Sequence, residues 1–450
     1  MELERTSAVN VGLSEELVRK YIDGMEKEQI HSYMIEKDGK VIAEGAVEPY
    51  SLTYSRSLYS LTKTISVMAL GFLLENKKIS LDDELYKFFP EYESRCTNGL
   101  IHSCHVRDLL TMQCGMPCKN SDHDFYEAPD WLEELFTGKP EHEPGTYFEY
   151  DNRCAYTLSA IVTRVTGKSV YELLNEKVFL PMDIHDVIWE TDKKHVRQGG
   201  WGMSTTLETV AKLGRLLLNE GKWNGIQLLN REWVNTCLSV QVNTSSLGDY
   251  NKKYGYGYQI WAGKPENVWL ARGAFGQLCI LCKNQNTVIS MFAGLQNYNA
   301  VLDLTWKFIE SIDQMPKRNE ISETIWKANE NALGLETFSI KSGAEDIVRM
   351  KVNGSVYEFK AGHESWSYNE LPIEKFSPMT EVFWKKALCK ASWVNEKYIL
   401  NITFVESPYH DTMIAYRNDD KLQIDYICSP QIRIRGKEYH IYLEKENAKK

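Results

Sequence analysis

The stretch LYSLTKTISVMALGFLLENKKISLDDEL, residues 58–85, places a serine and a lysine three positions apart at the start of an apolar run. Its apolar residues recur every three or four positions, which is the period of a helix with one buried face. These positions are Ile65, Met68, Ala69, Phe72 and Leu73. The pattern predicts a helix from about Ser60 to Asn76, with Ser60 at its start.

Ser60 and Lys63 form an S-x-x-K motif that suits nucleophilic catalysis. Residues three apart share a helix face, so the amine lies within hydrogen-bond reach of the hydroxyl. The positive end of the helix dipole disfavours a protonated lysine, and a buried neutral Lys63 could accept the serine proton. The alternative is that Ser60 only caps the helix and Lys63 is an exposed first-turn residue.

A second candidate element is Tyr150-Asp151-Asn152, directly before a predicted helix at 153–166. A tyrosine near a lysine cation can have a lowered phenol pKa and then shuttle protons. Asn152 could hydrogen-bond Lys63 and a substrate carbonyl. The alternative is again a helix cap, and a second Tyr-x-Asn at Tyr416-Arg417-Asn418 shows that the pattern arises easily.

Outward from this centre, the chain predicts a mixed α+β fold. A helix at 14–27 precedes a hairpin around Asp38-Gly39, and strands return from about Tyr254 to Ala293. The order of strands, a helical middle and further strands indicates one antiparallel sheet packed against helices. Further helices are expected at 106–112, 207–219 and 302–312.

The last part of the chain has a different texture. Alternating β-branched and aromatic residues with Asn-Gly and Asp-Asp turns predict an all-β domain at 325–450, either lipocalin-like or a sandwich. The polar segment 314–324, with Pro316, separates it from a first domain at 1–315. This domain could cap the site, mediate homodimerisation or only stabilise the fold.

Composition limits the function classes. The net charge of -10 argues against nucleic-acid or anionic-membrane partners. Residues 1–25 lack the apolar run of a secretory signal, so we expect a cytoplasmic protein. The 10 cysteines are expected to be free thiols, and we expect no metal. The metal alternatives are a C-x-x-C at Cys279 and Cys282, and a group formed by Cys114, Cys118, His102, His105 and His123.

With these motifs together, the chain resembles the serine β-lactamase and penicillin-binding-protein superfamily. The resemblance is to the class C-like branch of esterases, D-aminopeptidases and 6-aminohexanoate-dimer hydrolases. It extends through residues 58–85, HVRDLLTMQCGM (105–116), FEYDNRCAYTLSAIVTRVTGKSVYELL (148–174) and residues 199–234, in the family's order. It implies a β-lactamase/transpeptidase-like fold and a cofactor-free acyl-enzyme mechanism.

The resemblance also implies roles for single residues. Ser60 would be the nucleophile, Lys63 its activator, Tyr150 the general base and acid, and Asn152 a positioning group. The family's third motif, Lys-Thr-Gly or His-x-Gly, is here Ala271-Arg272-Gly273. Arg272 is displaced by one position, which in a strand turns its side chain to the other face and puts recognition of a substrate carboxylate in question.

The N–H near Ala274, with that of Ser60, could still form an oxyanion hole. Aromatic residues are expected around the pocket, although several could be core residues: Tyr59, Trp201, Tyr254, Tyr256, Tyr258 and Trp261.

Two function hypotheses remain. One is a hydrolase of a small-molecule ester or amide, and the other is a catalytically silent ligand-binding or scaffold protein of the same fold. β-Lactamase and D-alanyl carboxypeptidase activities rank lower because their targets lie outside the cytoplasm.

Overall fold

The computed structural model describes residues 2–95, 99–117, 128–248, 251–314, 324–343, 345–363, 365–370, 386–394, 397–405, 410–418, 421–429 and 438–445. The chain forms two compact units, one of residues 1–6 and 21–310 and the other of residues 7–20 and 311–450. Most of the predicted boundary, residues 315–323, lies outside the described residues.

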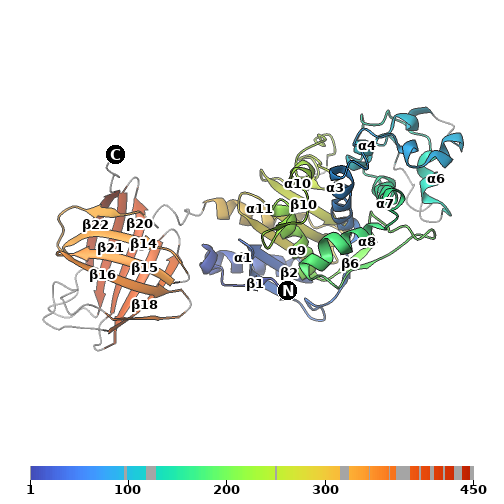
Figure 1. Cartoon of the computed structure of the whole chain (residues 1–450). Helices are drawn as coiled ribbons and strands as arrows, with labels where there is room; N and C mark the ends of the chain where they lie inside the picture. Colours follow the sequence, from blue (N-terminus) through green and yellow to red (C-terminus); the bar gives the residue numbers. More distant parts are fainter. Residues whose placement is uncertain are drawn as a thin grey trace. The chain divides into compact units, whose positions relative to one another are not determined.

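A seven-stranded sheet forms the centre of the first unit (Figure 1). Its strands, in spatial order, are β1 (Glu4–Arg5), β3 (Lys40–Ala46), β2 (Ser32–Lys37), β12 (Thr287–Phe292), β11 (Gln277–Cys282), β10 (Val268–Gly273) and β9 (Trp261–Ala262). The pairs are antiparallel except β1 with β3. The predicted hairpin is confirmed, and its turn residues Asp38 and Gly39 have φ of 53° and 86°.

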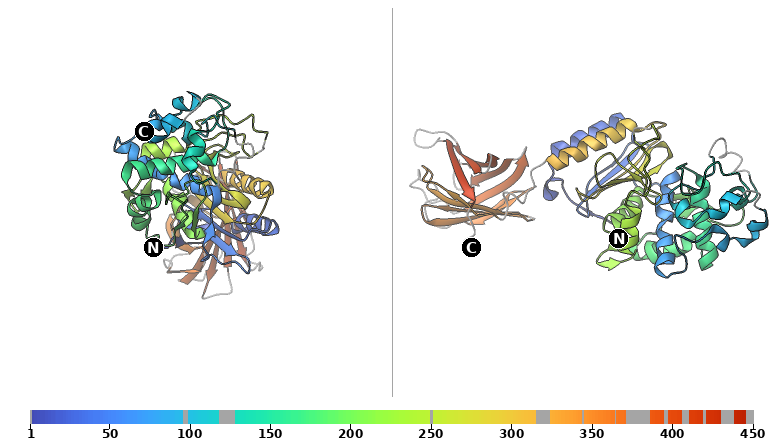
Figure 2. Two further views of the ribbon diagram at one scale, coloured as in Figure 1. Left: turned by 90° about the vertical axis from the view of Figure 1, so that its right-hand side faces the viewer. Right: turned by 90° about the horizontal axis from the view of Figure 1, so that it is seen from above.

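Helices cover both faces of this sheet. On one face α9 (Leu207–Leu218) approaches so closely that a Cβ on Gly214 would lie 2.6 Å from Cys279 Sγ. On the other, α1 (Glu15–Lys27) and α11 (Asn299–Gln314) lie side by side (Figure 2). The Tyr21 hydroxyl is 2.7 Å from Thr305 Oγ1. Helices packed against one sheet are the α+β arrangement that the sequence predicts.

The remaining helices lie between the two halves of the sheet in sequence. They are α2 (Thr62–Ser66), α3 (Met68–Glu75), α4 (Val106–Leu110), α6 (Trp131–Phe136), α7 (Asn152–Thr166), α8 (Val170–Leu174) and α10 (Arg231–Cys237). The helix predicted from Ser60 to Asn76 is divided: a 3-10 turn at Tyr59–Leu61 precedes α2, and Val67 joins α2 to α3. Gly167 ends α7 with φ of 71°, as predicted.

Short strands complete the first unit. β4 (Arg56–Ser57), β6 (Met203–Thr205) and β5 (Ile188–Trp189) form a three-stranded sheet, and β7 (Lys222–Trp223) pairs with β8 (Ile226–Gln227). The first of these sheets brings the chain before Ser60 next to the chain after Trp201.

The second unit is a closed β-barrel. Its strands run β16, β15, β14, β13, β22, β21, β20, β19, β18 and β17, and a parallel bridge from Gly362 of β16 to Lys390 of β18 closes the ring. Alternate residues face inward, so strands such as β19 bury every second side chain. The all-β prediction is confirmed, whereas the sandwich alternative is wrong because the sheet closes on itself.

The barrel strands have these bounds: β13 Trp326–Ala328, β14 Leu335–Lys341, β15 Glu345–Val352, β16 Ser355–Gly362, β17 Ser367–Glu370, β18 Lys386–Val394, β19 Lys397–Phe404, β20 His410–Asn418, β21 Lys421–Ser429 and β22 Glu438–Lys445. The predicted Asn-Gly turn joins β15 to β16, with Asn353 and Gly354 at positive φ. The predicted Asp-Asp turn, residues 419–420, lies outside the described residues.

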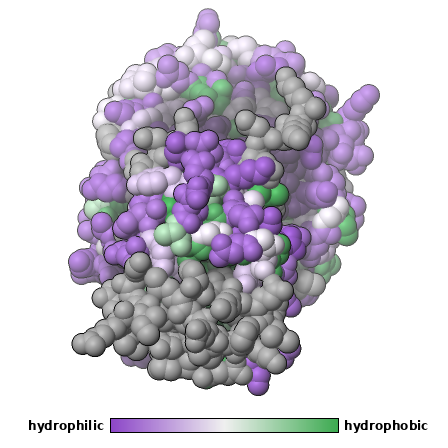
Figure 3. Space-filling view, turned by 90° about the vertical axis from the view of Figure 1, so that its left-hand side faces the viewer, coloured by the Kyte–Doolittle hydropathy of each residue, from purple (hydrophilic) through white to green (hydrophobic). Residues whose placement is uncertain are grey.

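In the described part of the chain, no helix combines the length and apolar character needed to cross a bilayer. On the face shown in Figure 3, the described residues are mostly hydrophilic, with apolar side chains scattered among them.

Candidate active site

Ser60 lies on a tight turn that strand β10 holds in place. A Cβ on Gly273 would overlap the carbonyl oxygen of Leu58, so only glycine allows the strand to lie this close to the serine turn. Tyr59, directly before the serine, has a φ of 48°. Left-handed backbone at a non-glycine residue costs energy and tends to occur at functional sites. The turn therefore holds Ser60 beside the end of β10.

Lys63 is buried beneath Ser60, with 1% of its surface exposed. Its Nζ lies 3.1 Å from Ser60 Oγ, 2.7 Å from Asn152 Oδ1 and 2.8 Å from the carbonyl oxygen of Gly200. Both carbonyl oxygens can only accept hydrogen bonds. A neutral amine would donate its two N–H groups to them and direct its lone pair at the serine hydroxyl. The structure thus brings together Ser60, Lys63 and Asn152, as the sequence predicts, and the exposed-lysine alternative is wrong.

The Tyr150-Asp151-Asn152 segment is anchored by a buried ion pair. Asp151 caps α7 by accepting from the Arg153 N–H at 2.8 Å, and its two oxygens also accept from Arg153 Nε at 3.0 and 2.8 Å. Arg153 Nη2 donates to the carbonyl oxygen of Pro117 at 2.9 Å. Burial would lower the pKa of Arg153, but the Asp151 charge outweighs burial and holds it above its usual value. The middle residue of the triplet therefore ties the start of α7 to a buried ion pair.

Tyr150 lies in the site, but its protonation differs from the prediction. Burial raises the pKa of its phenol to about 12, although a hydrogen bond with Ser60 and the charges of Arg272 and Lys252 act in the opposite direction. Lys63 Nζ lies over the Tyr150 ring, 4.9 Å from its centre. The expected lowering of the phenol pKa is therefore wrong, and Tyr150 is protonated at neutral pH.

The third motif lies where the sequence places it, on β10. Ala271 faces the core between α2 and α9, beside Leu61 and Thr64. Arg272 faces the other way, as strand alternation requires, but this face borders a pocket that also contains Ser60. Ala274 follows at the start of a 3-10 turn, Ala274–Gly276, and also lines the pocket.

The pocket beside Ser60 has a volume of about 510 Å³. It combines aromatic walls with charged groups, a composition typical of small-molecule sites. Its lining residues are Ser60, Phe148, Glu149, Tyr150, Leu247, Lys252, Trp261, Arg272, Gly273, Ala274 and Tyr298. The sequence gives no signal for the pocket residues Glu149, Lys252 and Tyr298, because they lie in loops without a periodic pattern or motif.

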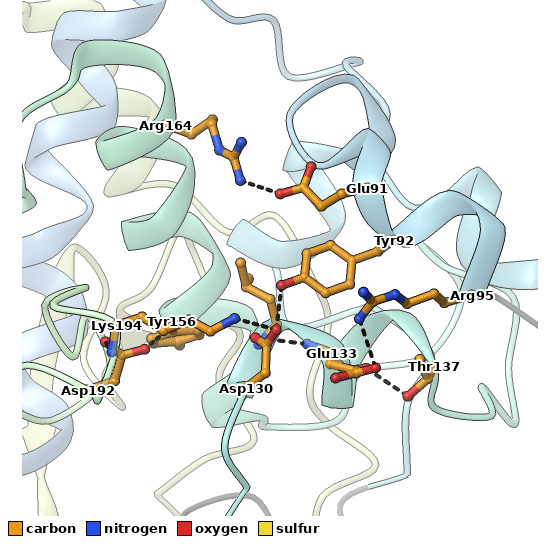
Figure 4. Close-up of polar contacts among 11 residues, drawn as sticks. Glu91, Tyr92, Arg95, Asp130, Glu133, Thr137, Tyr156, Arg164, Asp192 and Lys194 are labelled. Atoms are coloured by element: carbon orange, nitrogen blue, oxygen red, sulfur yellow. Dashed lines mark hydrogen bonds and ion pairs between the residues drawn. The ribbon is translucent and has the colours of Figure 1, made fainter.

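The loop that carries Gly200 is held by a polar network (Figure 4). Asp130, the cap of α6, accepts from Lys194 Nζ and, at 2.6 Å, from the Tyr92 hydroxyl. Asp192 accepts from the Tyr156 hydroxyl of α7. The network thereby attaches residues 192–194, which lead to the Lys63 acceptor at Gly200, to two helices.

The predicted aromatic residues divide between pocket and core. Trp261 lines the pocket and stacks on Tyr150 at 5.7 Å, whereas Tyr256 and Tyr258 are buried. Tyr59 is exposed and contacts Phe275 edge-on at 5.2 Å.

The second Tyr-x-Asn belongs to the barrel, where the Tyr416 hydroxyl donates to Asp425 at 3.0 Å. Its position, not its sequence, separates it from the site.

The cysteines do not form the two metal sites that their spacing suggests. Cys279 faces α9, and Cys282 lies near Tyr21 on the opposite face, so the C-x-x-C cannot hold one ion. Cys118 and His123 lie outside the described residues. Among the residues that are described, no three His, Cys, Asp or Glu side chains form a metal-binding group, and the eight described cysteines are free and buried.

The fold and the Ser60–Lys63–Tyr150 arrangement define the class as β-lactamase/transpeptidase-like. The chain belongs to the Beta-lactamase family, whose model matches residues 20–314. Among curated proteins it is similar to Protein Rv1367c of Mycobacterium tuberculosis, with 23% identity over 258 residues that cover 46% of this chain and 63% of that protein. The chain thus spans less than two thirds of that relative's length.

Solved structures show the same fold. EstCE1, a hydrolase with promiscuous acyltransferase activity, has a TM-score of 0.56 at 14% identity. The match covers 66% of this chain and 98% of the EstCE1 chain. The octameric penicillin-binding protein homologue from Pyrococcus abyssi has a TM-score of 0.52 at 16% identity. The match covers 95% of this chain and 99% of that structure's chain. At these identities the likeness concerns the fold.

Proposed function

We propose that the protein is a serine acyl hydrolase that cleaves an ester or amide of a small molecule through an acyl-enzyme on Ser60. The observation that supports this most is the environment of Lys63. Two carbonyl acceptors, Asn152 Oδ1 and Gly200 O, occupy both N–H groups of a neutral amine and leave its lone pair for Ser60 Oγ at 3.1 Å.

The proton path follows from a neutral Lys63, which can accept a proton, and a protonated Tyr150, which can donate one. Lys63 takes the Ser60 proton while Oγ forms a bond to the substrate carbonyl carbon. The N–H groups of Ser60 and Ala274 stabilise the resulting oxyanion, a contribution of about 3 to 4 kcal/mol per donor. Tyr150, protonated because its pKa is raised to about 12, gives a proton to the leaving oxygen or nitrogen as its bond to carbon breaks. Lys63 then gives its proton to the Tyr150 phenolate, which returns both groups to their starting forms.

Deacylation reverses these steps with water. A water molecule gives its proton to the Lys63 and Tyr150 pair and attacks the acyl carbon, and Ser60 leaves with a proton returned from Lys63. The cycle needs no cofactor.

The alternative is a ligand-binding or scaffold protein that has lost turnover. Ala271 supports it, because the family's third motif carries a basic residue there. β-Lactamase and D-alanyl carboxypeptidase activities are lower-ranked forms of the same chemistry. A homodimer and a cytoplasmic location stay predictions.

The test is intact mass after incubation with a fluorophosphonate, with turnover of p-nitrophenyl acetate, p-nitrophenyl butyrate and nitrocefin measured in parallel. We expect one adduct on the wild type, none on Ser60→Ala, and an unchanged adduct on Ser57→Ala. Ser57 is the matched control because it lies in the same segment outside the pocket. Absence of both adduct and Ser60-dependent turnover would favour the silent binding protein.

A further inference from the structure

Gln277 is a buried glutamine at the start of β11, immediately after the turn Ala274–Gly276, which we call the oxyanion turn. Across the β10–β11 hairpin it is the partner of Gly273. A Cβ on Gly273 would lie 2.9 Å from the Cβ of Gln277, and Gln277 exposes 2% of its surface. The glutamine therefore packs against the backbone one residue away from Ala274, the proposed oxyanion donor.

The side-chain amide of Gln277 is used as a donor. Its Nε2 donates to the carbonyl oxygen of Ala274 at 3.2 Å and to that of Ala293 at 2.9 Å. Its Oε1 is buried and accepts no hydrogen bond from the described residues. Because both neighbours are carbonyl oxygens, only the NH₂ group can face them, so the orientation of the amide is fixed. An unpaired buried acceptor lowers stability, so stability alone does not account for a glutamine at this position.

The oxyanion turn has an unfavourable backbone that these bonds hold in place. Phe275 has a φ of 61° and a ψ of 18°, a left-handed conformation that costs energy for a residue with a side chain. The N–H of Leu295 donates to the carbonyl oxygen of Phe275 at 3.0 Å. Two successive carbonyls of the turn are thus tied to residues 293–295, directly after β12. These anchors hold the turn, and with it the N–H of Ala274, in one orientation.

We propose that Gln277 is a positioning residue, whose bond to the Ala274 carbonyl keeps the Ala274 N–H directed at the carbonyl oxygen of the substrate. The inference rests on the proposed hydrolase function and adds a residue that does not line the pocket. An oxyanion donor acts only when it is aligned with the oxygen on which charge develops in the transition state. Loss of Gln277 should therefore lower kcat and leave KM nearly unchanged.

The chain offers a matched control in Gln259. This glutamine also exposes 2% of its surface, and its Nε2 donates to two carbonyl oxygens, those of Leu109 at 2.9 Å and Leu110 at 3.1 Å. Its Oε1 is likewise buried and without a partner among the described residues. Gln259 does not line the pocket and does not contact the oxyanion turn. The two side chains therefore make the same kind of bonds, and only those of Gln277 reach the proposed oxyanion donor.

The experiment compares p-nitrophenyl acetate with its thiono analogue, in which sulfur replaces the carbonyl oxygen. Sulfur is a weak hydrogen-bond acceptor, so the thionoester gains little from oxyanion donors. Methionine is similar in length to glutamine and has no donor. For Gln277→Met we expect kcat for the oxygen ester to fall about 30-fold with KM within about threefold, and the thionoester rate to fall less than about threefold. The ratio of the two rates should thus fall about tenfold.

Two further variants complete the comparison. Gln259→Met should leave the ratio unchanged, and Gln277→Asn, which keeps the amide but shortens its reach, should lower the ratio by an intermediate factor. Gln277→Asn also replaces the methionine variant in the test if that variant does not fold. Both substrates are measured on one enzyme sample, so the folded fraction cancels from the ratio.

The outcomes separate the two proposals. Ser60-dependent turnover with an unchanged ratio in the Gln277 variants, meaning an equal fall on both substrates or no fall, would overturn the positioning role and leave the hydrolase function intact. An equal fall of the ratio in Gln259→Met would also overturn it, because the effect would then not depend on the oxyanion turn. Absence of Ser60-dependent turnover of both esters by the wild type would refute the hydrolase proposal, and the role of Gln277 would be refuted with it.

Discussion

The two Tyr-x-Asn triplets of this chain differ less in sequence than in surroundings. In both, a lysine amine lies over the tyrosine ring: Lys63 at 4.9 Å from the centre of Tyr150, and Lys397 at 4.4 Å from the centre of Tyr416. In the barrel, Lys397 is exposed and the tyrosine hydroxyl donates to Asp425. In the hydrolase unit, Lys63 is buried and also contacts Ser60.

Burial, rather than the triplet itself, therefore creates the candidate chemistry. An exposed lysine is hydrated, so its ring contact contributes only about 0.5 to 1 kcal/mol. The buried Lys63 instead contacts two carbonyl oxygens, Asn152 Oδ1 and Gly200 O, and burial disfavours the charged form of an amine.

The largest expected effect is on Lys63. Replacing it by methionine removes the proton acceptor, so we expect kcat/KM for p-nitrophenyl acetate to fall about 10³-fold. Lys397→Met, the matched change in the barrel, should leave the rate within twofold. Circular dichroism checks that both variants fold. A Lys63→Met enzyme that keeps a tenth of the activity would remove Lys63 from the mechanism.

Replacing Tyr150 should have a smaller effect on kcat/KM, with a characteristic dependence on pH. We expect Tyr150→Phe to lose about 10²-fold in kcat/KM and Tyr416→Phe to lose nothing. Because the pKa of Tyr150 is raised to about 12, its phenol stays protonated up to pH 10, and no change of rate with a midpoint between pH 7 and 10 should come from it.

The measurement is the profile of kcat/KM from pH 6 to 10.5 for wild type and Tyr150→Phe. The two profiles should be parallel on a logarithmic scale. A wild-type rise with a midpoint below pH 9 that is absent in Tyr150→Phe would mean that Tyr150 acts as a phenolate.

Sequence patterns predicted the parts of the site that are close in the chain. The spacing of Ser60 and Lys63 follows from helix periodicity, and the hairpin at Asp38-Gly39 follows from turn chemistry. The helix cap was expected at Asn152, but it is Asp151, one residue earlier. The alternating strands of residues 325–450 also predicted an all-β domain. Whether those strands close into a barrel depends on the bridge between Gly362 and Lys390, which no local pattern encodes.

Long-range contacts account for what was missed. Gly200 is 137 positions from Lys63, and only the folded chain brings its carbonyl to the amine. The raised pKa of Tyr150 likewise comes from burial, which a short motif does not reveal. For Arg272, the strand period correctly predicted a change of face, but only the fold shows that this face borders the pocket.

The smallest predicted effect is on stability, and it compares a buried ion pair with an exposed one. Asp151→Asn leaves the buried Arg153 charge without its partner, which should cost about 3 kcal/mol. A loss of this size lowers the midpoint of the corresponding thermal transition by roughly 6 °C or more. The matched barrel variant is Glu358→Gln, because the Arg349–Glu358 pair has both side chains about half exposed and should contribute less than about 1 kcal/mol. Thermal unfolding followed by circular dichroism measures both. If Asp151→Asn cost no more than Glu358→Gln, the segment that holds Tyr150 and Asn152 would not depend on its ion pair, and its geometry would have to come from the packing of α7 alone.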